Sequence, residues 1–297
     1  MREHEHIIRE LSPAYSICEP EGALTPLVFS SPHSGRVYPA CLLEKSRLDA
    51  LTLRRSEDCY VDELFACAAR LGAPLIAARF ARAYLDANRE PYELDPELFA
   101  EPLPDWANQQ SVRVAGGLGT VARIVADGQE IYGAPLRLQD ALDRIELLHR
   151  PYHEALSALL QRARRQFGYA VLIDCHSMPS NQMTKGGGVR PDFVLGDRFG
   201  TSCDPRLTRM VRQTLQTLGY DVHLNRPYAG GYITEHYGSP ARGLNALQIE
   251  INRALYLDEA TLERSEGFER LVKDLAMLVE RLVREGPPLQ EHRTAAE

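Results

Sequence analysis

The stretch AVLIDCHSMPS, residues 170–180, contains an apolar run that leads directly into an aspartate, a cysteine, a histidine and a serine. An uninterrupted apolar run of this length is typical of a strand that is buried on both faces. The carboxyl ends of buried parallel strands form the edge of the sheet at which α/β proteins bind ligands. The stretch therefore predicts a central strand at 169–173, followed by Asp174, His176 and Ser177 at a functional edge.

Similar apolar runs alternate with helical patterns along the 297 residues. Strands are expected within 25–35 and at 73–80, 169–173, 192–196, 220–225 and 246–251, and helices at 57–72, 137–167, 204–219 and 258–285. Pro151 is expected to divide or kink the second helix, and Asp127 and Gly128 to form the turn of a hairpin at 121–133. The alternation predicts an α/β fold with a mostly parallel sheet and helices on both faces.

No internal repeat and no long linker divides the chain, so a single domain is expected over residues 1–297. Residues 1–22 are expected to form a loose N-terminal arm, and residues 287–297 a disordered tail. The first ten residues, MREHEHIIRE, are too polar for a signal peptide. No stretch approaches the roughly 18 apolar residues that a membrane span requires.

Composition narrows the classes of partner. Hydrophobic residues make up 44% of the chain and charged residues 25%, as in ordinary globular proteins. A net charge of −7 without a long basic run argues against nucleic acid as a partner. The six cysteines are scattered and form no C-x-x-C pair, which with the polar N-terminus indicates reduced thiols in a cytoplasm. We therefore expect a small-molecule partner, and neither nucleic acid nor a membrane.

Polar side chains stand at the ends of three expected strands. His33 follows the first strand, His176 follows the central one, and Glu250 lies within the last one, ALQIEI. Glu57 and Asp58 lie near the start of an expected helix. Two histidines and one carboxylate, with a fourth position open, form a common catalytic zinc site. A separate carboxylate can then act as the general base toward water.

Each of these residues also has a purely structural interpretation. His33 could cap a turn, His176 could be a hydrogen-bonded core histidine, and Glu250 could form a buried ion pair with Arg253. Cys175 beside His176 invites a cysteine-hydrolase interpretation, but adjacent strand residues point to opposite faces. Ser177 lacks the G-x-S-x-G elbow of serine hydrolases. Residue types alone therefore leave the metal site and these alternatives open.

Six segments together resemble the N-formylglutamate amidohydrolase (deformylase) family, which is related to zinc carboxypeptidases and aminoacylases. They are SPHSGRVYP, SEDCYVDELF, ARAYLDANREPYELDP, LIDCHSMPS, NRPYAGGYITEHYG and ALQIEINRALYLDE, and they span roughly residues 28–260. The resemblance implies a phosphorylase/hydrolase-like α/β fold and zinc or another divalent metal ion. His33 and His176 would be ligands, and Glu250 the general base. The acidic ligand lies in SED, where the resemblance favours Asp58 over Glu57.

The resemblance also implies the substrate: a small N-acyl amino acid, with N-formyl-L-glutamate first among the candidates. Arginines bind carboxylates in bidentate fashion, which makes Arg82 and Arg89 candidate anchors. Their structural alternative is ion pairing with Asp86, Glu90 or Glu93. Gly230 and Gly231 would let the backbone approach the ligand, and Thr234 and His236 would line the pocket. Another N-acyl amino acid or small amide as substrate, and a metal-free ligand-binding protein of the same fold, are the alternative functions.

Overall fold

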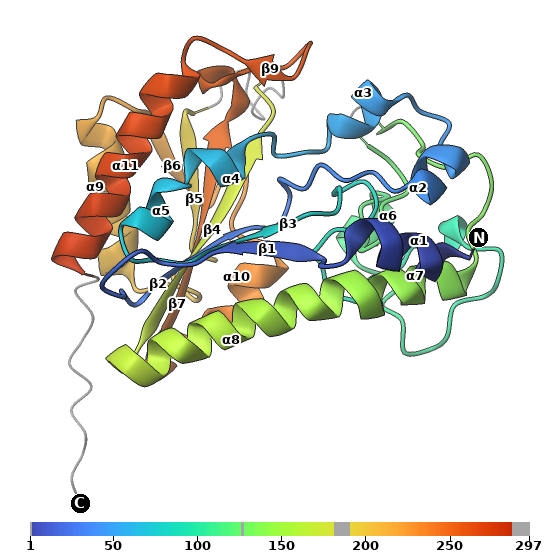
Figure 1. The fold of residues 1–297 in the computed structure, drawn as a ribbon, viewed down its shortest axis with the longest axis horizontal. Helices are drawn as coiled ribbons and strands as arrows, with labels where there is room; N and C mark the ends of the chain where they lie inside the picture. Colours follow the sequence, from blue (N-terminus) through green and yellow to red (C-terminus); the bar gives the residue numbers. More distant parts are fainter. Residues whose placement is uncertain (1, 126–127, 181–190, 287–297) are drawn as a thin grey trace, which may run out of the picture.

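A seven-stranded mixed sheet forms the centre of the protein in the computed structural model, which describes residues 2–125, 128–180 and 191–286 (Figure 1). The strand order is β1-β3-β2-β4-β7-β5-β6. The strands are β1 (Tyr15–Cys18), β2 (Leu27–Ser31), β3 (Leu75–Ala78), β4 (Ala170–Met178), β5 (Phe193–Gly196), β6 (Val222–Leu224) and β7 (Leu244–Asn252). Pairs β2/β3, β2/β4, β4/β7 and β5/β6 are parallel, while β1/β3 and β5/β7 are antiparallel. The expected mostly parallel sheet is confirmed.

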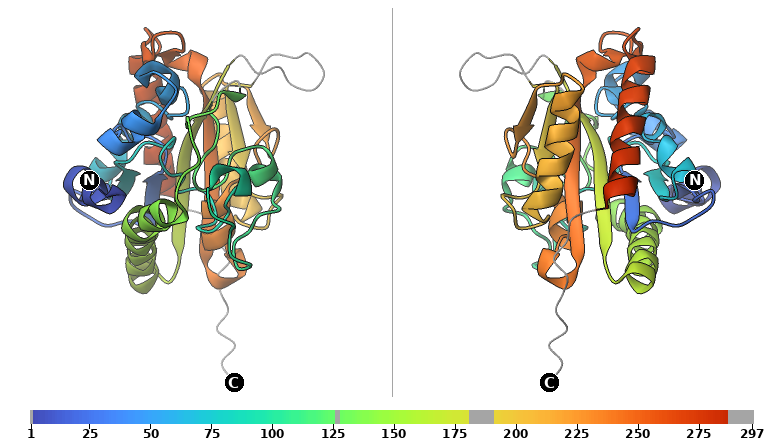
Figure 2. Two further views of the ribbon diagram at one scale, coloured as in Figure 1. Left: turned by 90° about the vertical axis from the view of Figure 1, so that its right-hand side faces the viewer. Right: turned by 90° about the vertical axis from the view of Figure 1, so that its left-hand side faces the viewer.

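Helices cover both faces of this sheet, as the alternation predicted. One apolar cluster contains residues of α1 (Glu3–Leu11), α2 (Ala40–Lys45), α3 (Ala50–Arg54), α7 (Leu138–Arg144), α8 (Arg150–Phe167) and α10 (Tyr232–Tyr237). The other contains residues of α4 (Val61–Leu64), α5 (Cys67–Arg70), α9 (Pro205–Thr217) and α11 (Phe268–Glu285). Figure 2 shows α9 and α11 side by side against the sheet. Leu172 and Ile173 of β4 belong to different clusters, so both faces of this strand are buried.

The N-terminal residues are not a loose arm. They form α1 and the edge strand β1, which pairs with β3. Glu3 is buried and forms ion pairs with Arg144 and Lys45, and it accepts a hydrogen bond from the Tyr84 hydroxyl at 2.9 Å. The polar sequence of this segment does not predict this packing, because Arg144, which pairs with Glu3, lies about 140 residues away along the chain. The expected tail at 287–297 lies outside the described residues.

Several element boundaries differ from the expected ones. The helix expected at 57–72 is two short helices, α4 and α5, and α11 begins at Phe268 because a small hairpin of β8 (Leu257–Asp258) and β9 (Glu263–Arg264) precedes it. At 137–167, a π-helical turn at Ile145–His149 separates α7 from α8, which has Pro151 in its first turn. That division agrees with the expected break at Pro151, since proline lacks the N–H that an inner turn requires.

The hairpin expected at 121–133 is reduced to a short antiparallel bridge between Ile124 and Glu130. The N–H of Ile131 donates to the carbonyl of Arg123 at 2.9 Å. The expected turn residue Asp127 lies outside the described residues. The helix at 204–219 begins as expected, since the Asp204 side chain accepts a hydrogen bond from the N–H of Arg206. Among the described residues, no helix combines the length and the hydrophobicity that crossing a membrane requires.

Candidate active site

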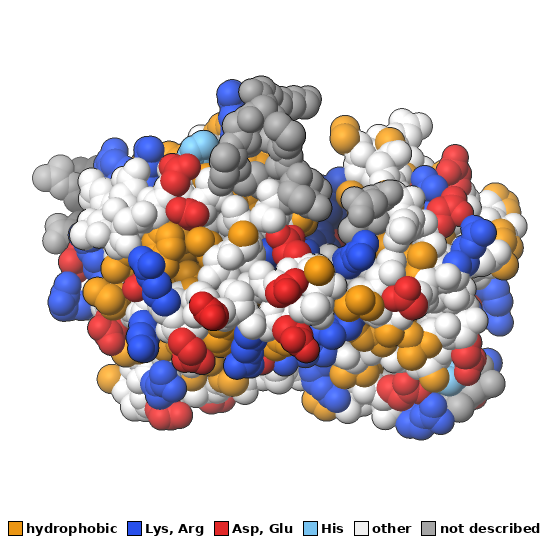
Figure 3. Space-filling model, turned by 90° about the horizontal axis from the view of Figure 1, so that it is seen from above, with side chains coloured by type: hydrophobic (Ala, Val, Ile, Leu, Met, Phe, Trp, Pro, Cys, Tyr) orange, Lys and Arg blue, Asp and Glu red, His pale blue; other side chains and the backbone are white. Residues whose placement is uncertain are grey.

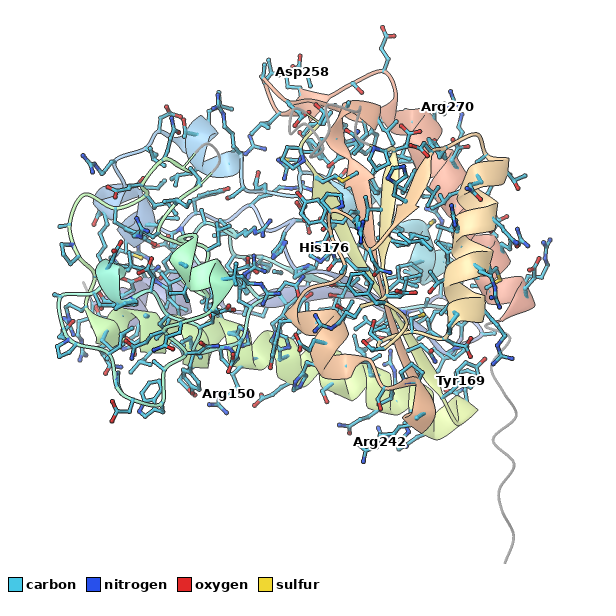
Figure 4. All side chains as sticks on the ribbon, turned by 180° about the vertical axis from the view of Figure 1, so that it is seen from behind. Arg150, Tyr169, His176, Arg242, Asp258 and Arg270 are labelled. Atoms are coloured by element: carbon cyan, nitrogen blue, oxygen red, sulfur yellow. The ribbon has the colours of Figure 1, made fainter. Side chains whose placement is uncertain are left out.

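The paired strands β4 and β7 present four polar side chains to one side of the sheet. The strand predicted to end at residue 173 continues to Met178, so Asp174 and His176 lie inside it rather than after it. In the parallel register, Asp174 lies opposite Gln248 and His176 opposite Glu250. Because strand side chains alternate between faces, Cys175 and Ile249 point into the apolar cluster on the other side. Figure 4 shows β4 running from Tyr169 at its start to His176 in the interior.

Two loops bring the remaining members of the site together. His33 follows the end of β2, and its carbonyl accepts a hydrogen bond from the N–H of Asp58 at 3.0 Å. Asp58 lies in the loop that precedes α4. The buried Arg253, just after β7, donates to Oδ1 of Asp58 at 3.1 Å and to the carbonyl of Glu57 at 2.6 Å. The loop is thereby held against the carboxyl end of the sheet.

His33, Asp58 and His176 converge on one point. The Nδ1 atoms of the two histidines are 3.1 Å apart, and Oδ2 of Asp58 lies 3.1 Å from Nδ1 of His176 and 3.4 Å from Nδ1 of His33. One ligand atom from each of the three side chains lies within 4.8 Å of the others, and all three residues are buried. Together they form the only such group of three or more possible ligands within the described part of the chain.

A carboxylate holds the far nitrogen of each histidine ring. Nε2 of His33 lies 2.6 Å from Oδ1 of Asp86, and Nε2 of His176 lies 2.9 Å from Oδ2 of Asp174. A carboxylate accepts hydrogen bonds, so each Nε2 carries a proton, and Nδ1 is the nitrogen that each ring, when neutral, has left to bind a cation. Carboxylates that orient a histidine in this way are typical of metal sites.

The structure separates Asp58 from Glu57, which the sequence could not do. Glu57 points away from the histidines and pairs with Arg54 at 2.9 Å and with the Cys59 thiol at 3.4 Å. Burial raises the pKa of Glu57, whereas hydrogen bonds from His176 and His33 outweigh burial and lower the pKa of Asp58 well below its ordinary value. Asp58 is thus the acid that is placed to bind a metal ion.

Glu250 stands beside this group, and no arginine among the described residues forms an ion pair with it. The alternative ion pair with Arg253 does not form, because Arg253 instead contacts Asp58, the Ser177 hydroxyl and two backbone carbonyls. The Glu250 side chain receives a hydrogen bond from Nε2 of Gln248 at 2.9 Å. Burial raises the pKa of Glu250 to about 7, which is near the optimum for a group that exchanges protons at neutral pH.

A cavity of about 520 Å³ opens onto these residues. Its walls include His33, Asp58, His176 and Glu250, together with Arg82, Arg89, Arg113 and Gly231. Figure 3 views the molecule from above and shows Lys and Arg side chains at a recess between the part that holds the sheet and the part that holds α2 and α3. The site therefore combines a candidate metal centre, a carboxyl group and positive charge in one cavity.

The two candidate arginines share Asp86 and differ in their other contacts. Nε of Arg82 contacts Oδ2 of Asp86 at 3.1 Å. Arg89 uses Nε on the carbonyl of Leu118, Nη1 on the carbonyl of Asn88, and Nη2 toward Asp86 at 3.7 Å. The expected alternative, ion pairing with Asp86, is therefore present for both. All three side-chain nitrogens of Arg89 contact other protein groups, while Arg82 contacts Asp86 through Nε.

Two expected pocket residues lie elsewhere. Thr234 is buried, and its hydroxyl donates to the carbonyl of Gly231 at 2.9 Å, so it supports the loop and does not line the cavity. His236 lines a second cavity of about 600 Å³, with His149, His153 and Tyr232. The structure thus places neither residue on the wall of the cavity that holds the metal-binding group. Gly231 does line the main cavity.

The covalent alternatives also fail on geometry. Cys175 lies on the opposite face of β4 from His176, and burial raises the pKa of its thiol well above the ordinary value. The Ser177 hydroxyl donates to Oδ1 of Asp58 at 3.2 Å and accepts from Nε of Arg253 at 3.2 Å. Neither side chain is paired with a histidine as a nucleophile requires.

The sequence analysis gave Asn88 and Gln248 no role, and it considered Asp86 and Arg253 only as possible ion-pair partners. Asp86 and Asn88 lie in the same motif as Arg82 and Arg89, and only their folded positions show that they contact the histidines. The position of Gln248, by contrast, could have been predicted from the sequence. It precedes Glu250 by two residues on a strand, and this period places both side chains on one face.

Known proteins match this chain over most of its length. Residues 25–257 match the family model described as N-formylglutamate amidohydrolase. An N-formylglutamate deformylase of Pseudomonas putida is 32% identical over 237 residues, which cover 79% of this chain and 82% of the relative. One of Pseudomonas aeruginosa is 33% identical over 241 residues, covering 79% and 83%. The crystal structure of N-formylglutamate amidohydrolase from Ralstonia eutropha JMP134 superposes with a TM-score of 0.86 at 37% identity, and covers 92% of this chain and 98% of that one.

Proposed function

The chain belongs to the N-formylglutamate amidohydrolase family, and we propose that it hydrolyses N-formyl-L-glutamate to formate and L-glutamate with a bound divalent metal ion, preferably zinc. The observation that carries the proposal is the convergence of His33, Asp58 and His176 beside Glu250 in a cavity lined by arginines. The names of the relatives supply the substrate, and the geometry supplies the chemistry.

The donor set fits zinc. Two imidazole nitrogens and one carboxylate oxygen, with a position left open toward a cavity, form a common catalytic zinc set. The two Nδ1 atoms and Oδ2 of Asp58 would hold the ion, while Asp86 and Asp174 keep the protons on the far nitrogens. When bound, the ion would acidify a water molecule and polarise the formamide carbonyl.

Glu250 supplies the proton transfers. As a carboxylate it takes a proton from the attacking water, and it then delivers that proton to the nitrogen of the leaving glutamate as the C–N bond breaks. One oxygen, Oε1, already accepts a hydrogen bond from Gln248, so we assign the proton to Oε2. Formate and free L-glutamate balance one formamide and one water.

A substrate with two carboxylates requires positive charge in the cavity. Arg82 is the anchor that we favour, because its contact with Asp86 uses Nε and the guanidinium also carries two Nη groups. Arg89 keeps a more indirect role, since its three nitrogens hold the carbonyls of Leu118 and Asn88 and face Asp86. Gly231 lines the same wall, and Arg113 adds a third positive charge there.

The test compares N-formylglutamate, N-formylglutamine and N-formylmethionine, in the wild type and in Arg82→Ala, with and without chelator treatment. A carboxylate–arginine hydrogen bond contributes roughly 1.5–3 kcal/mol. We therefore expect about 10- to 100-fold lower kcat/KM for N-formylglutamate in Arg82→Ala and a much smaller change for N-formylmethionine. Arg47→Ala, which removes an exposed arginine paired with Glu130 outside the cavity, is the control.

Chelation should abolish turnover, and added zinc should restore it. Equal rates on all three substrates, unchanged by Arg82→Ala, would leave an amidohydrolase without acidic specificity. Tight binding of N-formylglutamate by metal-free protein, with no turnover after zinc is added, would support the ligand-binding alternative.

A further inference from the structure

Gln248 is buried beside Glu250, and its side chain donates a hydrogen bond to that carboxyl group. It lies two residues earlier on β7, so both side chains face the cavity, and only 4% of Gln248 is exposed. A buried amide needs partners for its oxygen and its NH₂ group, because an unpaired polar group costs free energy. Its two partners here are the backbone of Gly231 and the carboxyl group of Glu250.

The backbone of Gly231 fixes which end of the amide faces Glu250. The N–H of Gly231 is a donor, so the atom of Gln248 that lies 2.9 Å from it must be the oxygen, Oε1. The NH₂ group then points to Oε1 of Glu250, also at 2.9 Å. A flip of the amide would place two donors against each other at Gly231 and two acceptors against each other at Glu250.

Gly231 is itself held in place. A Cβ at this position would lie 2.4 Å from Nδ2 of Asn88, so the backbone packs directly on that amide. Oδ1 of Asn88 accepts the N–H of Ile233 at 2.8 Å, and the Thr234 hydroxyl donates to the carbonyl of Gly231. The donor that orients Gln248 therefore belongs to a tightly packed part of the fold rather than to a free loop.

We propose that Gln248 is a positioning residue for Glu250. The hydrogen bond from the N–H of Gly231 orients the Gln248 amide, and the amide in turn fixes the direction of the Glu250 carboxyl group. This inference rests on the proposed role of Glu250 as general base. Gln248 occupies Oε1 and so directs Oε2 toward the reacting water and the leaving nitrogen. A carboxyl group free to rotate would spend less time in the productive direction, and misplacement of a reacting group by about 1 Å can cost on the order of 100-fold in rate.

The test is a double-mutant cycle of Gln248→Met and Glu250→Gln in zinc-loaded protein. Methionine has a similar length and forms neither hydrogen bond. We expect Gln248→Met to lower kcat about 10- to 100-fold, with KM for N-formylglutamate and zinc content unchanged within about threefold. Glu250→Gln should lower kcat roughly 100- to 10,000-fold. In that background Gln248→Met should lower kcat by less than about twofold, because the group that it positions is gone.

Asn245→Leu provides the matched control. Asn245 is another buried amide on β7, and its Oδ1 also accepts a backbone N–H, that of Asp204 at 2.8 Å, but it lies outside the cavity. Its loss should lower the melting temperature and leave kcat unchanged. If Gln248→Met does not fold, Gln248→Ala replaces it, since alanine also forms neither hydrogen bond and leaves space for water beside the N–H of Gly231.

The outcomes separate this proposal from the proposed function. The positioning role is overturned if Gln248→Met has a normal kcat, or if it lowers kcat by the same factor in the wild type and in Glu250→Gln. The assignment of Glu250 as general base still stands in that case, provided that Glu250→Gln is inactive. Near-normal kcat in Glu250→Gln removes the base assignment, and the role of Gln248 falls with it.

Discussion

Two histidine clusters contact the segment 86–89, and they differ in the groups that hold their rings. His33 and His176 contact carboxylates at one nitrogen and face each other and Asp58 at the other. His149 and His153 bind the backbone carbonyls of Arg89 and Ala87 through Nε2, at 2.9 and 2.8 Å. The second cluster contains more histidines once His236 is included, yet its rings stack on each other and on tyrosines.

The difference lies in the carboxylate partners of the rings, and it changes the charge that each cluster favours. The carboxylates Asp174 and Asp58 outweigh burial and raise the pKa of His176 well above its ordinary value. Burial without any such partner lowers the pKa of His153 to about 3. The first cluster attracts positive charge to its centre, and the second excludes it.

The largest expected contrast comes from removing one histidine of each cluster. His176→Ala should weaken zinc binding by more than about 100-fold, since losing a ligand costs more than the roughly 10- to 100-fold typical of losing a ligand's own partner. His149→Ala should leave zinc affinity unchanged. Competition with a chromogenic chelator measures both. Equal zinc affinity in the two variants would mean that the metal-binding group has been misplaced.

The carboxylate partners can be tested without touching a ligand. Asp174→Asn keeps the shape of the side chain but removes the charge that orients His176, and should weaken zinc binding by about 10- to 100-fold. Tyr237→Phe is the counterpart in the second cluster, where it removes the hydroxyl that lies 3.0 Å from Nδ1 of His153. No change in zinc affinity is expected there. If Tyr237→Phe weakened zinc binding as much as Asp174→Asn does, the distinction between the two histidine clusters would be contradicted.

The second cluster should instead control stability at acid pH. The pKa of His153 is about 3 in the folded protein against about 6.5 when unfolded, so the unfolded state binds the proton first. Stability from this group is present above pH 6.5 and is lost as the pH falls toward 3. Between pH 7 and pH 5 the loss should be about 2 kcal/mol. We therefore expect the free energies of unfolding of the metal-stripped wild type and of His153→Gln, measured with denaturant, to approach each other as the pH falls to 5. Parallel plots of this free energy against pH would refute the assignment.

The smallest effect is expected at Cys175, which lies on the face of β4 opposite His176. Its thiol points into the apolar cluster, away from His176. Cys175→Ala should keep kcat within a few-fold and lower the free energy of unfolding by about 1–2 kcal/mol through the smaller buried volume. Complete inactivation of folded, zinc-loaded Cys175→Ala would return the cysteine-hydrolase mechanism to consideration.

Much of the site followed from local sequence. The apolar runs predicted the central strands, and the period of two along a strand predicted that Cys175 and His176 point to opposite faces. Local patterns failed where a partner was distant. The polar segment at residues 1–22 was expected to be loose because its sequence does not show that Arg144 and Lys45 receive Glu3. His236 was expected in the pocket because a motif does not show which way its helix turns.

The sequence by itself determined the fold class, the family and the short set of residues that could bind a metal ion, because hydrophobic periodicity and motifs are local properties. Only the tertiary structure placed Asp58 rather than Glu57 beside the histidines, gave Arg253 partners other than Glu250, and brought Asp86 to Nε2 of His33. These choices depend on distances between segments far apart in the chain, and on which nitrogen or oxygen each neighbour occupies. Such contacts exist only once the sheet has brought the strand ends together.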